Sequence, residues 1–193
     1  MTTEYTPFDK SFRTKHKLCP SRTTLREQFH MALRQARTFE DVKKGSITTL
    51  DGLRKQGAER IGFVSGIITS EGAEHLDINV SRLDHYANLL RETLPFPIFC
   101  GIDLFPHELR SKLEQQPECA WNAFWMNMIK SGRISDLFMA PKWEKSTGAS
   151  IAYKAGREMG LNIHYIFPNG NNRDNIILAN FYVTQNGCSY RFL

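Results

Sequence analysis

Two short segments of the sequence contain residue types that bind an anion. The first is SGIITSEG, residues 65–72, in which hydroxyl side chains surround a glycine. Gly66 permits close approach of the backbone to a ligand, and the hydroxyl groups of Ser65 and Ser70 can donate hydrogen bonds. The segment follows a short apolar run that is typical of a buried strand. Ligands of open parallel sheets bind beyond the carboxyl ends of the strands, so this turn is a candidate binding loop.

The second segment is WEKSTGAS, residues 143–150, at the expected start of a helix. The free amides and the dipole of a helix N-terminus favour a phosphate group. Lys145 and Ser146 add a positive charge and a hydroxyl, and Gly148 completes the candidate phosphate site. Trp143, in the loop, is the candidate for stacking against a base. The alternative for either segment is an ordinary strand-to-helix turn with a Ser or Thr cap.

Both segments lie in a repeated strand, loop and helix pattern, which indicates a parallel sheet with crossover helices. The expected strands cover residues 60–65, 98–100, 136–140, 161–167, 176–183 and 189–192. The last two are expected to form a hairpin, because Asn-Gly is a strong hairpin signal. The expected helices of this part cover residues 74–94, 106–115, 119–130 and 149–159. We therefore predict an α/β fold with an open, mostly parallel, Rossmann-like sheet flanked by helices.

A basic helical extension, residues 1–58, is expected to precede the α/β domain of residues 59–193. The extension holds 12 Lys and Arg against 6 Asp and Glu, whereas the rest of the chain holds 13 against 14. It therefore carries the whole excess behind the net charge of +5. Helices are expected over residues 21–37 and 48–56. The helix of residues 21–37 carries an apolar stripe that consists of Leu25, Phe29, Leu33 and Ala36. This stripe must pack on another surface, either in the same chain or in a second subunit of a homodimer.

Composition excludes several classes of protein. No apolar run approaches the roughly 20 residues of a membrane helix, and the first ten residues lack the pattern of a secretion signal. We therefore expect a cytosolic protein without a membrane partner. The four cysteines are scattered without a CxxC pair, so neither a metal nor a cofactor is expected. Glycine and arginine repeats with interleaved aromatic residues are missing, so nucleic acid is not the expected partner of the basic extension.

The segments 63–72, FVSGIITSEG, and 138–166, FMAPKWEKSTGASIAYKAGREMGLNIHYI, resemble the nucleoside 2-deoxyribosyltransferase-like superfamily. The likeness covers roughly residues 59–166. It extends to small members with a W-E-x-S-x-G-A element. This resemblance implies a Rossmann-like fold, a nucleotide or nucleoside ligand and a nucleotide N-glycosidase or deoxyribosyltransferase activity. Relatives often complete their sites across a dimer, so it also implies a possible homodimer.

The resemblance further implies roles for individual positions. Members that use free nucleosides carry an Asp six residues before the catalytic Glu, whereas the nucleotide hydrolases carry a Ser that binds the 5′-phosphate. This chain has Ser146 there, which favours a nucleoside 5′-monophosphate, because a carboxylate would repel a phosphate dianion. The position of the nucleophilic Glu is occupied by Ala152, which cannot attack or stabilise the anomeric carbon. Asn127 falls near a sugar-contacting Asp of the family if one residue is inserted.

Three hypotheses of function follow. The first is a nucleoside 5′-monophosphate N-glycosidase-like protein with little or no turnover, and the second is a non-catalytic nucleotide-sensing or binding module. The third, a basic nucleic-acid binder, predicts affinity that depends steeply on salt. Ala152 fits either a protein that only binds or a deliberate replacement of Glu that traps a ligand. It also fits a residue chosen simply because alanine forms helices well.

Other residues with chemical potential are assigned structural roles. Glu71, Glu144 and Asp103 are expected to be solvated surface charges. Asp136 opens its strand and should lie at the end of the sheet far from the ligand. Tyr153 and His164 are expected to pack, as is the helical stripe of Trp121, Phe124, Trp125 and Met128.

Overall fold

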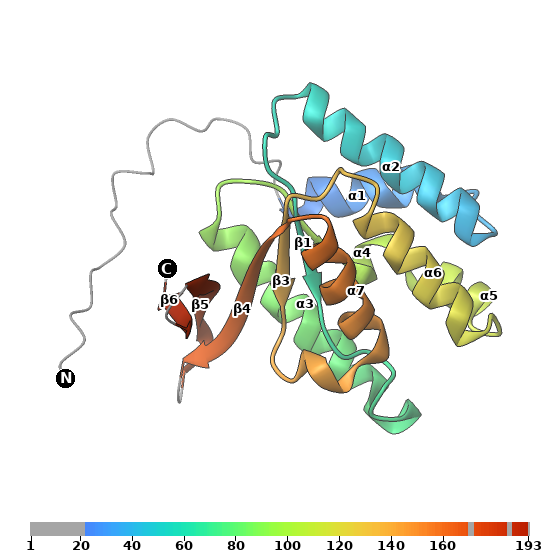
Figure 1. Ribbon diagram of the computed structural model, residues 1–193. Helices are drawn as coiled ribbons and strands as arrows, with labels where there is room; N and C mark the ends of the chain where they lie inside the picture. Colours follow the sequence, from blue (N-terminus) through green and yellow to red (C-terminus); the bar gives the residue numbers. More distant parts are fainter. Residues whose placement is uncertain (1–21, 170–171, 185–186, 193) are drawn as a thin grey trace.

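The computed structural model describes residues 22–169, 172–184 and 187–192, and shows an α/β fold (Figure 1). Within these residues the sheet has six strands in the order β2-β1-β3-β4-β5-β6. Four neighbouring strands are parallel and two at one edge are antiparallel. Their bounds are β1 Gly62–Ser65, β2 Ile98–Cys100, β3 Asp136–Met139, β4 Asn162–Asn169, β5 Asn172–Thr184 and β6 Gly187–Phe192. The mostly parallel sheet flanked by helices is confirmed, and residues 185–186 of the expected hairpin turn lie outside the described part.

The two faces of the sheet are buried in two separate apolar clusters. Successive side chains of a strand point to opposite faces, so Phe63 joins one cluster and Val64 joins the other. The face with Val64 packs against α3, Leu76–Thr93, which follows the short 3₁₀ turn η2, Ala73–His75. The face with Phe63 packs against the remaining helices (Figure 1). These are α1 Arg22–Leu33, α2 Phe39–Lys55, α4 Gly101–Leu104, α5 His107–Leu113, α6 Glu118–Ile129 and α7 Thr147–Glu158.

The apolar stripe of α1 packs inside its own chain. Leu25, Phe29 and Leu33 are buried in the same cluster as the sheet residue Phe99, and the rings of Phe29 and Phe99 lie 5.4 Å apart. The stripe is therefore already covered, and the described part of the expected basic extension shares one core with the sheet. Residues 1–21 of that extension lie outside the described residues. None of the described helices is both long enough and apolar enough to span a bilayer.

The second helix, α2, begins at Phe39 and not at the expected Thr48. Thr38 caps it, with its hydroxyl accepting from the N–H of Asp41, while the Asp41 carboxylate accepts from the N–H of Thr38. This reciprocal pair is a capping box in which aspartate takes the third helical position. The first turns of α2, from Phe39 to residue 47, were not predicted because apolar periodicity does not indicate this cap.

Asp103 was expected at the surface, and that prediction is wrong. Its side chain is fully buried in α4, a four-residue helix that the sequence pattern also missed. The carboxylate accepts from Arg26 of α1 at 2.6 Å, from the Cys100 N–H at 2.8 Å and from Arg91 of α3. Arg26 also pairs with Asp84 of α3. Buried carboxylates need such partners, and this cluster joins α1, α3 and α4.

Asp136 lies at the amino end of β3, far from the carboxyl ends of the strands, as predicted. It is fully buried and accepts from His164 at 2.8 Å, from Arg60 at 2.5 Å and from Ser135 at 2.7 Å. Burial by itself raises the pKa of this carboxyl group. The hydrogen bonds from His164, Arg60 and Ser135 outweigh burial and hold the pKa well below its usual range. His164 also stacks on Phe138, which fits its expected packing role.

The low pKa of Asp136 predicts a loss of stability in acid. An Asp in the unfolded chain titrates near about 3.9, so below that pH the unfolded state binds a proton that the folded state still excludes. We expect the difference in free energy of unfolding between wild type and Asp136→Asn to be largest at pH 7. It should shrink by about 1–2 kcal/mol as the pH falls toward 3. Urea unfolding at a series of pH values measures this, and parallel pH profiles would contradict it.

Candidate functional site

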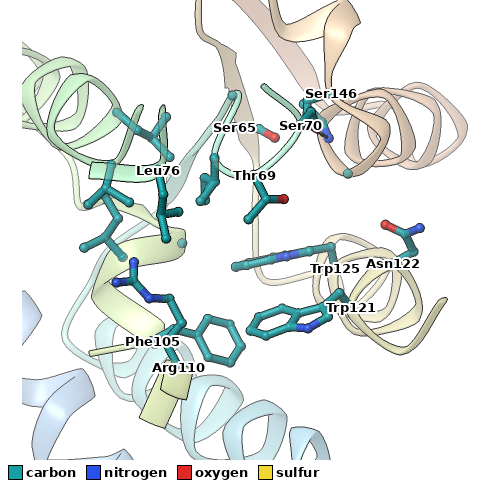
Figure 2. A pocket seen from close by; sticks show the side chains of 18 of the residues that line it. Ser65, Thr69, Ser70, Leu76, Phe105, Arg110, Trp121, Asn122, Trp125 and Ser146 are labelled. Atoms are coloured by element: carbon teal, nitrogen blue, oxygen red, sulfur yellow. Dashed lines mark hydrogen bonds between the residues drawn. The ribbon is translucent and has the colours of Figure 1, made fainter. Parts of the chain in front are cut away.

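A cavity of about 400 Å³ opens at the carboxyl ends of β1 and β2 (Figure 2). Its walls come from the turn after β1, the start of α3, α4, α5, α6 and the start of α7. This is the position at which ligands of open α/β sheets bind, and the volume lies in the range of small-molecule sites. The cavity is therefore the candidate functional site.

The two candidate loops meet at this cavity because β1 and β3 are parallel neighbours. The Ala140 N–H, just after β3, donates to the Ser65 carbonyl at 2.8 Å. A Cβ atom on Gly66 would lie 2.7 Å from the Ala140 Cβ, so only glycine allows the two loops to approach this closely. Ser65, Gly66 and Ser70 all line the cavity. Thr69 lines it too, a hydroxyl that the sequence analysis did not single out.

The N-terminus of α7 faces the same cavity. Ser146 is its N-cap, and the buried hydroxyl accepts from the Ala149 N–H at 3.3 Å while its own hydrogen remains available to donate. The first intrahelical bond joins the Ser150 N–H to the Ser146 carbonyl. The amides of Thr147 and Gly148 therefore precede the helical hydrogen-bond ladder. Ser146 and Gly148 both line the cavity.

Aromatic side chains form the wall opposite the hydroxyl groups. Figure 2 shows Trp121, Trp125 and Phe105 facing the group of Ser65, Thr69, Ser70 and Ser146 across the cavity. The Trp125 ring is stacked on Phe63 with centroids 5.2 Å apart, and Trp121 lies 4.9 Å from Phe105. Both indoles are therefore held in place and partly exposed to the cavity.

The stripe of α6 was expected to be core, and this is right for only part of it. Phe124 and Met128 are buried, whereas Trp121 and Trp125 line the cavity. The spacing of four residues places the two indoles on one side of the helix. Tryptophan is large and is rarely fully buried. That property was the available indication that these two residues reach a cavity.

Four of the candidate residues lie outside the cavity lining. Trp143 belongs to a 3₁₀ turn, η3, Trp143–Lys145, and packs on Tyr153 with centroids 4.6 Å apart. Lys145 is exposed at the end of that turn. Ala152 is buried between α7 and the rest of the core, with 1% of its surface exposed. Asn127 is exposed on α6, two residues beyond Trp125 and hence on roughly the opposite side of the helix.

Among the residues that the structure describes, the charged ones that line the cavity are on the side of α5 and α6: Arg110, Glu114 and Glu118. Within the described residues no three His, Cys, Asp or Glu side chains form a group that can hold a metal ion. Cys100 and Cys119 are free, while Cys19 and the Cys188 side chain lie outside what the structure describes. Cys100 is fully buried behind the cavity, and burial raises the pKa of its thiol.

In comparisons with family models, curated proteins and solved structures, no match to the chain was found.

Proposed function

We propose that the protein binds a nucleoside 5′-monophosphate in this cavity, on a Rossmann-like scaffold that resembles the nucleotide N-glycosidases. One observation carries the proposal. The α7 N-terminus with Ser146, the turn at Ser65 and Gly66, and the two indoles of α6 all face one cavity. A phosphate and an aromatic base are the two chemical groups that these opposite walls suit.

The phosphate is placed at the wall formed by α7 and the turn after β1. The dipole and the leading amides of α7 favour an anion there. Ser146 donates its hydroxyl hydrogen to a phosphate oxygen, and Ser65, Thr69 and Ser70 offer further hydroxyl donors. All of these groups are neutral donors, so they bind a dianion without bringing a repelling carboxylate next to it.

The base is placed against the indoles of Trp121 and Trp125. Stacking between a base and an aromatic side chain contributes about 1–3 kcal/mol. Phe63 and Phe105 hold the two indoles in their orientation. A preorganised aromatic wall reduces the entropy lost on binding, so α6 and not the loop at Trp143 is the expected stacking platform.

The activity that we propose is binding, with hydrolysis as the second candidate. The resemblance puts the nucleophile at Ala152, whose methyl group is buried outside the cavity lining and carries no carboxylate. Glu118 does line the cavity, and a carboxylate near the sugar is what cleavage of an N-glycosidic bond needs. Release of free base, measured in the same samples as binding, separates a binding module from a hydrolase.

Tryptophan fluorescence tests the proposal directly, because the chain has three tryptophans and two of them line the cavity. Titration with nucleoside 5′-monophosphates should change the fluorescence and raise the melting temperature. Trp121→Leu should weaken binding by about 5–150-fold, since it removes a stacking surface and keeps an apolar side chain.

Trp143→Leu is the matched control, because Trp143 packs on Tyr153 outside the cavity. It should leave the dissociation constant unchanged within about threefold, because the Trp143 side chain does not line the cavity and leucine keeps the backbone hydrogen bond from the Ser146 N–H to the carbonyl of residue 143. Equal effects of the two substitutions, or no binding of any nucleoside monophosphate to the wild type, would refute the proposed function.

A further inference from the structure

We propose that guanine is the base that the cavity selects. This inference rests on the nucleotide proposal above and names its ligand more closely. It comes from the side of the cavity formed by α5, which the phosphate and the stacking wall do not use. There the half-buried Arg110 and the exposed Glu114 both line the cavity, and within the described residues the fold assigns neither of them an ion-pair partner.

Arg110 and Glu114 are four residues apart at the end of α5, and both line the cavity. Residues with this spacing lie on the same side of a helix. Figure 2 shows the Arg110 side chain extending past Phe105 toward the Leu76 side of the cavity. Among the residues that the structure describes, neither Arg110 nor Glu114 has an ion pair or a side-chain hydrogen bond, either with each other or with a third residue.

A guanidinium and a carboxylate that are both unpaired and both line one side of a cavity suit a ligand that offers acceptors on one edge and donors on the next. Arginine binds two neighbouring acceptors with its planar fork. A carboxylate accepts from two neighbouring donors. Gln116, Glu118 and Asn122 also line the cavity, but Arg110 supplies the one guanidinium among the described lining residues, and Glu114 is the carboxylate on the same side of the same helix.

Guanine carries both patterns on adjacent edges. Its O6 and N7 atoms are acceptors that an arginine binds in a bidentate manner, and its N1–H and 2-amino groups are donors for a carboxylate. Adenine has an amino group in place of O6, so it would turn a donor toward Arg110, and it has no hydrogen on N1 for Glu114 to accept. We therefore assign O6 and N7 to Arg110, and N1–H and the 2-amino group to Glu114.

Affinities of the full-length protein for GMP, IMP and AMP test this assignment. GMP should bind roughly 10–100-fold more tightly than AMP, as expected for one or two good bidentate pairs. IMP, which has O6, N7 and N1–H but no 2-amino group, should lie between them. Arg110→Met and Glu114→Gln should each weaken GMP binding by about tenfold or more and leave AMP within about threefold.

Matched controls lie on the same helix. Lys112→Met and Glu108→Gln remove the same kinds of charge from exposed positions of α5 that do not line the cavity. Both controls should bind GMP as the wild type does. If they weaken GMP binding as much as the cavity variants do, general electrostatics and not base recognition is responsible, and the assignment is overturned.

The remaining outcomes separate the two proposals. Equal affinity for GMP and AMP overturns the guanine assignment while the nucleotide site stands. If Arg110→Met lowers the affinities for GMP and AMP by the same factor, Arg110 binds the phosphate that both nucleotides share. That result also overturns the assignment. If none of the three nucleotides binds, the proposed function itself fails.

Discussion

Ser146→Asp should abolish the binding of nucleoside 5′-monophosphates without loss of stability. Aspartate caps a helix as well as serine does, so its carboxylate can accept the Ala149 N–H that the Ser146 hydroxyl accepts now. The carboxylate would lie beside the proposed phosphate position. Two unit charges about 4 Å apart repel by about 4 kcal/mol at an effective dielectric constant of about 20. We therefore expect at least a roughly hundredfold loss of affinity, because each 1.4 kcal/mol is about tenfold.

Titration calorimetry with a nucleoside monophosphate and the matching free nucleoside measures this effect. The nucleoside carries no phosphate, so its affinity should change by less than about tenfold. Ser146→Asn is the matched control, since asparagine has the size and capping ability of aspartate without the charge. A Ser146→Asp protein that still binds the monophosphate as tightly as the wild type would place the phosphate elsewhere.

Asp103→Asn should destabilise the protein by about 3–5 kcal/mol, the cost of removing one partner from a buried ion pair. The substitution keeps the shape of the side chain but removes the charge that Arg26 and Arg91 share. Arg91 is almost fully buried and would lose its short ion pair, keeping the longer one to the Asp84 carboxylate at 3.9 Å. Urea unfolding at pH 7 gives the difference in free energy of unfolding.

Asp51→Asn is the control for Asp103→Asn. Asp51 pairs with Arg133 at 3.0 Å, but both side chains are about 40% exposed. Exposed pairs contribute about 0–1 kcal/mol, so this variant should unfold close to the wild type. If the two variants lose the same stability, the buried cluster at Asp103 does not hold α1 and α4 in the way described.

The strands were the most predictable part of the fold. A short apolar run bounded by Pro97 and Gly101 predicted β2 with its observed bounds, because a strand buried on both faces is apolar throughout. α4 was missed because four residues are too few to show a helical period. Asp103 was placed at the surface for a related reason. Nothing in the sequence around Asp103 indicates that Arg26 and Arg91, which lie 77 and 12 residues earlier, bind its carboxylate.

The candidate site was predictable at its loops and not at its opposite wall. The turn at Ser65 and the cap at Ser146 were found because glycine and hydroxyl residues follow strands that a parallel sheet brings together. Trp121 and Trp125 were not predicted as site residues. Helical spacing indicates which residues share one side of a helix, but it does not indicate whether that side faces the core or a cavity. The direction of Trp143 depends on Lys142, which adopts the left-handed conformation with φ of 62° before the turn. Such a backbone state is uncommon for lysine and does not follow from the residue type.

The packing of α1 means that the boundary of charge at residue 58 is not a boundary of folding. A fragment that began at residue 59 would uncover the Phe99 face of the sheet and deprive the Asp103 carboxylate of Arg26. α4, which contains Asp103, also supplies Gly101 and Ile102 to the cavity. α1 therefore belongs to the same folded core as the cavity, and removing it would remove the support of a cavity wall.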